Sequence, residues 1–323
     1  MERKSIGTQT LNTTLPGFFP SENINVKFGE APFTVLLDSL TDLNSKNKQR
    51  LENVSNCWGV FKDSPVAESI LLICEELQQD PLVGYQALEI LDRFMIKHLE
   101  NLLSCQHVGD TTKGDGRSHE ETVLETLRDK STLLVFSCIQ LASKLTHHLS
   151  SIDNNRAVAF LKSIGHSCSK ETLLESEVVI LKTLDFSINF PNPLIYVETL
   201  LEVLDYNAAI VPAAHLYCLC QRVLQFVCLQ RTAIYESLLV AVTACPSPSQ
   251  EQSRASFVCV KEDYMLLSVG VIAVAAFIHN FVTWEKVVEE LSHITGISPQ
   301  SIRDFASVTM LHVVKSETPF KTT

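Results

Sequence analysis

Residues capable of catalysis are plentiful in this chain, but their spacing does not form the motifs that enzymes use. The 323 residues include 10 Cys and 10 His. No Gly-x-Ser-x-Gly elbow, no His-Glu-x-x-His pair and no Gly-rich phosphate loop occurs. Because no spacing places a nucleophile beside a base, we expect a protein that is not an enzyme and that has neither catalytic residues nor a cofactor.

The residues that resemble metal ligands are equally uninformative. His147 and His148 are adjacent, so their side chains diverge from a helix end and do not converge on one ion. The cysteines include Cys218-Leu219-Cys220 but no Cys-x-x-Cys pair, which zinc sites normally require. We therefore expect no metal site and mostly buried, reduced cysteines.

Charge and hydropathy exclude further classes of protein. The net charge of -11 argues against a direct grip on nucleic acid, which depends on clustered Lys and Arg. The apolar run from Met265 to Ile278 is shorter than the roughly 20 residues that a membrane-spanning helix needs, so it predicts a buried central helix. Residues 1–14 lack the apolar core of a signal peptide, and we expect a nuclear or cytosolic protein without membrane contact.

Apolar residues recur at helical spacing along most of the chain, and no alternating strand pattern persists. The sequence therefore predicts an all-α fold. In its first half we expect helices over residues 33–57, 64–77, 85–95, 131–145, 156–165 and 173–184. The first of these would precede the first domain and lie against it, and the helix over 131–145, apolar on most sides, would lie at its centre.

Proline, glycine and polar clusters divide the chain into domains. We place the domain boundary at Phe190-Pro191-Asn192-Pro193. In the second half we expect helices over residues 194–204, 212–229, 234–243, 260–279, 284–295 and 299–314, with an exposed loop over 245–256. The expected organisation is a flexible arm (1–32), a first domain (33–190) with a long exposed loop (104–121), a second domain (191–315) and a tail (316–323).

Three segments in order resemble the signatures of the cyclin box. Leu91-Asp92-Arg93-Phe94 resembles its second helix, Leu141-Ala142-Ser143-Lys144 the end of its third, and Glu177 to Phe186 its fifth. The resemblance to the cyclin family extends from about Phe33 to Val314. It implies two tandem cyclin-like five-helix bundles, in which Leu91, Asp92, Arg93, Phe94, Ala142 and Ser143 are structural residues.

The resemblance also implies a docking site. In cyclins that activate kinases, a lysine ending the third helix and a glutamate of the fifth make polar contacts with the kinase, and the matching residues are Lys144 and Glu177. The fold would bring them together although they are 33 positions apart (177 - 144). Alternatively, they are a surface pair worth less than about 1 kcal/mol.

Two departures from the family pattern bear on function. Lys144 is followed by Leu145-Thr146-His147-His148 in place of an aromatic residue and two acids, so part of the kinase contact is missing. The helix that contains Val66 to Cys74 has neither the Arg nor the Trp of substrate-recruiting cyclins. Because that Arg normally pairs with the aspartate matching Asp92, we expect Asp92 to find another donor or to stay partly exposed.

The resemblance favours a non-catalytic regulatory subunit or scaffold that docks a cyclin-dependent kinase or kinase-like protein. More narrowly, the chain resembles cyclin-box proteins associated with crossover designation and maturation in meiosis. This implies a nuclear, chromosome-associated role among other recombination proteins, with a cytoplasmic fraction allowed. The alternatives are a kinase-independent adaptor that uses the same bundles, and a general transcription factor of the initiation factor B type, against which the acidic charge argues.

Overall fold

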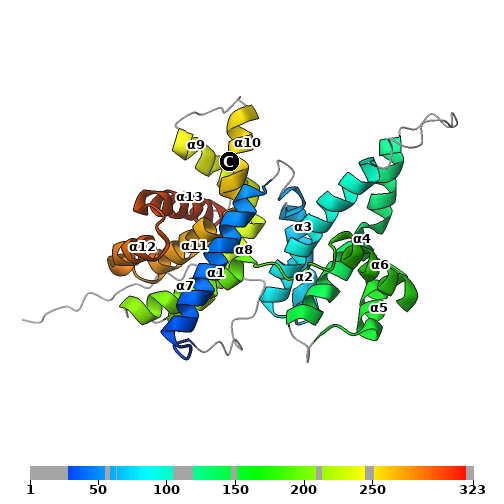
Figure 1. Ribbon diagram of the computed structural model, residues 1–323, viewed down its shortest axis with the longest axis horizontal. Coiled ribbons are helices and arrows are strands. Elements are labelled where there is room, and N and C mark those ends of the chain that lie inside the picture. Colours follow the sequence, from blue (N-terminus) through cyan, green and yellow to red (C-terminus); the bar gives the residue numbers. More distant parts are fainter. Residues whose placement is uncertain are drawn as a thin grey trace, which may run out of the picture.

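The computed structural model is built from α-helices (Figure 1). It describes residues 28–54, 59–62, 64–104, 119–146, 151–208, 213–243 and 251–317. Within these ranges there are thirteen α-helices and one 3-10 turn, and no strand. The predicted all-α class is therefore confirmed. The expected arm before residue 28 and the last residues of the expected tail lie outside the described ranges.

The first half of the molecule is a bundle around α4. Its elements are η1 (Val60–Lys62), α2 (Ser64–Glu76), α3 (Pro81–Ser104), α4 (His119–Thr146), α5 (Asn154–Ser163) and α6 (Lys170–Thr183). Asp153 accepts the backbone N–H groups of Asn155 and Arg156 at 2.7 and 3.0 Å, and Ser169 accepts that of Thr172 at 3.1 Å. These side chains satisfy otherwise unpaired donors, which explains why α5 and α6 begin where they do.

Helix α4 packs against α2, α3 and α6, as expected for the central helix. Its residues from Leu133 to Ser143 are buried, apart from the half-buried Val135. The helix is longer than predicted, because it begins at His119, and α3 continues to Ser104. The ends of the expected loop over 104–121 are therefore helical, and residues 105–118 lie outside the described part.

The second half is arranged around α11 (Tyr264–His279). Its other helices are α7 (Pro193–Ala208), α8 (Ala213–Leu229), α9 (Arg231–Thr243), α10 (Glu251–Glu262), α12 (Phe281–Thr295) and α13 (Pro299–Glu317). Helix α11 packs on α7, α8, α12 and α13, and nearly all of its residues from Tyr264 to Ala276 are buried. The apolar run is thus a central helix of the bundle, as predicted.

The helices can be compared with membrane-spanning helices by their length and apolar character. Among the described residues, no single helix is both long and apolar enough to cross a membrane. Helices α8 and α9 reach the required length and composition only as a pair, and they are bent by 87° at their junction.

The segment before α11 corrects two predictions. A single helix was expected over residues 260–279, but the chain breaks at Asp263, which accepts the N–H of Leu266 at 2.9 Å and caps α11. Residues 251–256, expected in a loop, belong to α10. The Pro and Ser residues before position 250 led to a loop prediction that extended too far into the polar start of this helix.

Helix α1 (Phe33–Glu52) lies against the second half, so the prediction that it packs on the first domain is wrong. Its buried Leu36 and Leu43 face α7, and Tyr196 of α7 donates to the carbonyl of Leu43 at 3.1 Å. Asn47 donates to Asp263 at 2.9 Å and accepts the N–H of Tyr264 at 3.0 Å. Apolar spacing identified the buried face of α1, but such spacing carries no information about which helices cover that face.

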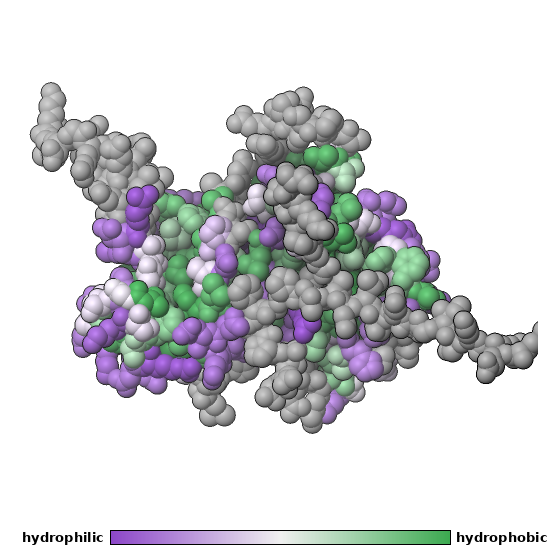
Figure 2. All heavy atoms as spheres, turned by 180° about the vertical axis from the view of Figure 1, so that it is seen from behind, coloured by the Kyte–Doolittle hydropathy of each residue, from purple (hydrophilic) through white to green (hydrophobic). Residues whose placement is uncertain are grey.

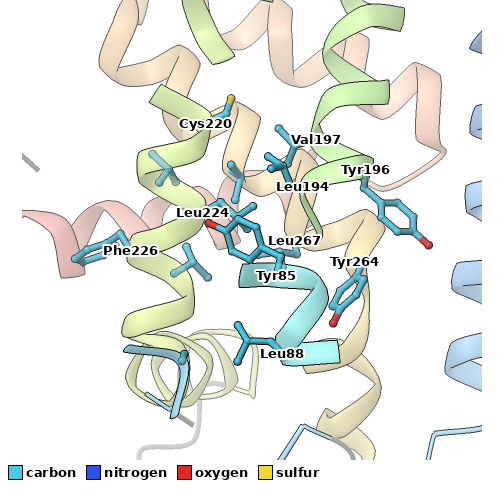
Figure 3. Packing of buried hydrophobic residues seen from close by; sticks show 14 of the residues in the cluster. Tyr85, Leu88, Leu194, Tyr196, Val197, Cys220, Leu224, Phe226, Tyr264 and Leu267 are labelled. Atoms are coloured by element: carbon cyan, nitrogen blue, oxygen red, sulfur yellow. The ribbon is translucent and has the colours of Figure 1, made fainter. Parts of the chain in front are cut away.

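The two halves share one hydrophobic core. Figure 3 shows Tyr85 and Leu88 of α3 among side chains of α7, α8 and α11, including Leu194, Leu224 and Leu267. Polar contacts also hold the connector between α6 and α7, residues 184–192. Gln86 of α3 donates to the carbonyl of Ile188 at 2.9 Å and accepts from Asn192 at 3.1 Å. The connector is therefore tied to α3, which fixes how the two halves meet.

Candidate protein-docking site

Lys144 and Glu177 form an ion pair at the surface of the first half. Lys144 is in the last turn of α4, and its Nζ donates to both carboxylate oxygens of Glu177 in α6, at 2.6 and 2.8 Å. The Lys144 side chain is 38% exposed, whereas that of Glu177 is 7% exposed. The structure thus brings together the two residues predicted for docking and leaves the lysine accessible to a partner.

Hydrogen bonds beneath the pair hold α4 in position. The hydroxyl of Ser137 bonds to that of Ser176 in α6 at 2.9 Å. Ser143 donates to the carbonyl of Gln140 at 2.8 Å and accepts the N–H of Ile152 at 3.1 Å, while Ala142 is fully buried. Ser143 and Ala142 therefore face the interior, and Lys144 projects from a hydrogen-bonded support.

Exposed apolar side chains lie on the same two helices as this pair. Leu174 and Val178 lie at helical spacing beside Glu177 and are 42% and 44% exposed, and Leu145 follows Lys144 at 37%. Seen from behind, the half that contains α2 to α6 shows an apolar area with hydrophilic residues along its outer edge (Figure 2). Two helices that carry exposed apolar residues together with an ion pair have the composition of a protein-binding site.

The turn after α6 presents one more aromatic residue. Asp185 and Phe186 both have positive φ angles, 50° and 59°, which are unusual for residues with a Cβ. The N–H of Phe186 bonds to the carbonyl of Leu181 at 2.8 Å, and Asp185 pairs with Lys97 of α3. These contacts support the strained turn, which leaves Phe186 68% exposed.

Of the four signature residues of α3, Leu91, Asp92 and Phe94 are buried and Arg93 is half-buried. Leu91 and Phe94 lie in the core, and Arg93 lies over the ring of Phe190 at 3.4 Å. Asp92 is buried and accepts the N–H groups of Gly59 and Phe61, at 3.0 and 3.1 Å. The expectation that Asp92 would find another donor is confirmed. Burial raises the pKa of Asp92, although nearby Lys62 opposes this shift.

A buried cluster of charges joins the two halves, and sequence reasoning missed it. We call it the ion hub; it consists of Arg50 (α1), Lys62 (η1), Glu89 (α3), Arg231 (α9), Glu262 (α10) and Tyr264 (α11). Arg50 donates to Glu89 at 2.9 Å, to Tyr264 at 2.9 Å and to Glu262. A single guanidinium therefore connects α1 to both halves of the molecule.

The remaining hub contacts neutralise the two buried carboxylates. Lys62 lies 2.8 Å from Glu89 and 3.1 Å from Glu262, and Arg231 donates to Glu262 at 2.6 Å. Burial alone would raise the pKa of Glu89, but the charges of Arg50, Lys62 and Arg93 hold it well below its ordinary value. In the same way, burial is outweighed at Glu262, where Lys62, Arg50 and Arg231 lower the pKa to about 2. Both carboxylates are therefore ionised at neutral pH.

The hub joins elements of both halves of the fold, and the cavity beside it is small. The adjoining cavity, lined by Lys62, Tyr85, Tyr235 and Tyr264 among others, measures about 30 Å³, far below the hundreds of Å³ of a typical ligand pocket. No group of three or more potential metal ligands lies together among the described residues. One signal in the sequence pointed to the hub, namely a glutamate, Glu89, inside the otherwise apolar run from Ala87 to Leu91.

Known proteins resemble this chain over most of its length, although no family model matches it. The chain is 41% identical over 298 residues to human cyclin N-terminal domain-containing protein 1, covering 92% of this chain and 89% of the relative. The mouse protein of the same name is 40% identical over 295 residues, covering 91% and 87%. G2/mitotic-specific cyclin-2 of Saccharomyces cerevisiae is 28% identical over 127 residues, covering 39% and 20%. The resemblance to cyclins predicted from the sequence is thereby confirmed.

Proposed function

Because the chain belongs to the family of cyclin N-terminal domain-containing protein 1, we propose that it is a non-catalytic regulatory or scaffolding subunit that docks a cyclin-dependent kinase. We further propose that it acts in meiotic recombination, in crossover designation and maturation, as a nuclear, chromosome-associated protein. The kinase part of the proposal rests on the site and on the similarity to a mitotic cyclin. The meiotic part rests on the resemblance to cyclin-box proteins with that role.

The ion pair of Lys144 and Glu177 within exposed apolar residues is the observation that carries the proposal. A helix of a partner laid across α4 and α6 would cover Val178 and Phe186 and meet Lys144 at the edge of the contact. Apolar burial would supply most of the affinity. The charged pair would set the orientation, because an ammonium group and a carboxylate bond to backbone carbonyl and amide groups, respectively.

Such docking requires no chemistry from this chain. A kinase alternates between active and inactive arrangements, and a rigid partner that binds one arrangement better shifts the equilibrium toward it. Helices α4 and α6 are suited to this role, since Ser137 and Ser176 join them beneath the surface at 2.9 Å. The partner, not the cyclin fold, would undergo the change.

An exchange of the two charges tests the proposal without removing the internal ion pair. In Lys144→Glu combined with Glu177→Lys, the two side chains still attract each other, so an ion pair can still form between α4 and α6 while the charges offered to a partner are reversed. We expect a co-purified kinase to be lost from this variant. The matched control exchanges Arg303 and Glu285, an ion pair of α13 and α12 at 2.8 Å, and should retain the kinase. An unchanged set of partners after the first exchange would refute docking through this site.

A kinase-independent adaptor is the second candidate, and it is favoured by what the site and α2 lack. The exposed residue after Lys144 is Leu145, in place of the aromatic residue and the acids found in kinase-activating cyclins. Helix α2 exposes Glu68 and Leu72 and has neither Arg nor Trp. If the charge exchange removed non-kinase nuclear proteins while no kinase co-purified with the unaltered chain, the adaptor would be the better description.

A further inference from the structure

An aromatic cluster at the junction of α11 and α12 combines exposed and half-buried side chains. We call Phe277, Phe281, Val282 and Trp284 the α12 patch. The rings of Phe277 and Phe281 are 5.3 Å apart, and those of Phe277 and Trp284 are 5.4 Å apart. Phe281 is 65% and Val282 is 83% exposed, although both are in the first turn of an ordered helix.

The patch shows two signs of an absent neighbour. Single exposed apolar residues are ordinary, but clustered aromatic residues mark a contact surface. In addition, Nε1 of Trp284 is buried without a hydrogen-bond partner among the described residues, a state that indoles in proteins usually avoid. Neither sign involves Lys144, Glu177 or the surface around them, so the α12 patch is independent of the proposed kinase contact.

The chain itself leads toward this region. Phe28, the first described residue, packs edge-on against Tyr217 of α8 with ring centroids 5.3 Å apart, and the N–H of Gly29 donates to Glu202 of α7 at 3.2 Å. Helix α8 also approaches the end of α11, because the ring centroids of His215 in α8 and His279 in α11 are 6.3 Å apart. His279 is two residues before Phe281. The point at which residues 1–27 join the fold is thus held on helices that border the patch.

The preceding residues have a suitable length and composition. Within residues 1–27, the sequence Leu15-Pro16-Gly17-Phe18-Phe19-Pro20 places two aromatic residues between prolines. Helix α8 packs on α11, and α11 packs on α12, so the axes of α8 and α12 lie within two interhelical spacings, about 20 Å. The nine steps from Phe19 to Phe28 extend up to about 30 Å, which is enough to reach the patch.

We propose that the segment containing Phe18 and Phe19 docks on the α12 patch of its own chain. Phe18 and Phe19 supply aromatic partners for Phe281 and Trp284, and the flanking prolines reduce the freedom lost on docking. Tethering through Phe28 gives the segment an effective concentration of the order of millimolar, so a weak contact suffices. The docked segment would cover the α12 patch in the second half and leave the Lys144 surface in the first half open.

Photo-crosslinking in the full chain tests this proposal. A benzophenone amino acid is placed at position 19, and after irradiation the linked peptides are identified by mass spectrometry. We expect a link to residues 277–286 within one chain, with a yield that does not depend on protein concentration. Phe281→Ser should reduce the yield at least about threefold, the factor expected for one lost aromatic pair.

Matched variants separate docking from unfolding. Val242→Ser, at a residue of α9 that is 61% exposed, should leave the yield unchanged. If Phe281→Ser lowers helicity, Val282→Ser replaces it, because that side chain is 83% exposed and supports little of the fold. Links only between two chains, links only to other segments, or a yield unaffected by both patch variants would overturn the proposal.

Discussion

Replacing Arg50 by methionine should destabilise the whole molecule, because this guanidinium joins α1 to three other helices, α3, α10 and α11. It donates to Glu89 and Tyr264, both at 2.9 Å, and to Glu262, and its side chain is 6% exposed. Removing one partner of a buried ion pair costs about 3–5 kcal/mol. Lys62 and Arg231 still neutralise the carboxylates, so we expect a loss near the lower end, about 3 kcal/mol. Methionine retains much of the apolar stem, and the loss therefore measures the charge.

Urea unfolding followed by circular dichroism gives the free energy of unfolding for this comparison. The control is Lys46→Met in the same helix, because Lys46 forms an exposed pair with Asp42 at 2.7 Å. Such pairs contribute at most about 0.5 kcal/mol. If Arg50→Met lowered the unfolding free energy by no more than Lys46→Met does, the hub would not be a stabilising link between α1 and the two halves.

Three further predictions concern the core and its charges. First, Glu89 and Glu262 have lowered pKa values, so the unfolded chain binds more protons than the folded one below about pH 4.5. The unfolding free energy should therefore fall as the pH drops through this range, and the raised pKa of Asp92 should oppose this fall in part. In pH-dependent thermal unfolding, the fall should be less steep for Arg50→Met. A pH profile unchanged by Arg50→Met would contradict this assignment. Second, a Cβ at Gly270 would overlap the ring of Phe305, so Gly270→Ala should lower the unfolding free energy by about 1–3 kcal/mol. The control is Ser307→Ala on the exposed face of α13, which should change the unfolding free energy by no more than about 0.5 kcal/mol. Equal values for the two variants would disprove the close packing of α11 on α13. Third, Asp92→Ala leaves the N–H groups of Gly59 and Phe61 without their acceptor. Urea unfolding should show a free energy of unfolding lower by about 1–3 kcal/mol in this variant, with part of the loss recovered in Asp92→Asn. No difference between the two variants would argue against these hydrogen bonds.

Local sequence patterns were sufficient to predict most of the helices and both central ones. The apolar faces of α2, α3 and α6 follow from the helical spacing of their apolar residues. The central position of α11 follows from an apolar run that is too short for a membrane-spanning helix and too apolar for a helix at the surface. Asp153 and Ser169, which cap α5 and α6, are also recognisable locally. Such features depend on residues within one or two turns of each other.

The parts that were missed depend on distant partners. Arg50 and Glu262 are 212 positions apart, and nothing near either residue shows that they meet. Helix α1 presents an apolar stripe that would fit either half. Contacts with distant residues, such as those of Asn47 with Asp263 and Tyr264, hold it on the second half. The pairing of Lys144 with Glu177 follows from a family resemblance, which supplies a contact that local patterns cannot predict.

Hydrogen exchange on a purified complex with the co-isolated kinase tests the central claim most directly. Docking on the Lys144 surface predicts slower exchange on complex formation in residues 141–146 and 174–187, which contain Glu177 and the exposed Phe186. Residues 281–286 of α12 should be unaffected, because they lie in the other half of the molecule. Protection confined to other helices, with residues 174–187 exchanging as fast as in the free protein, would contradict the claim.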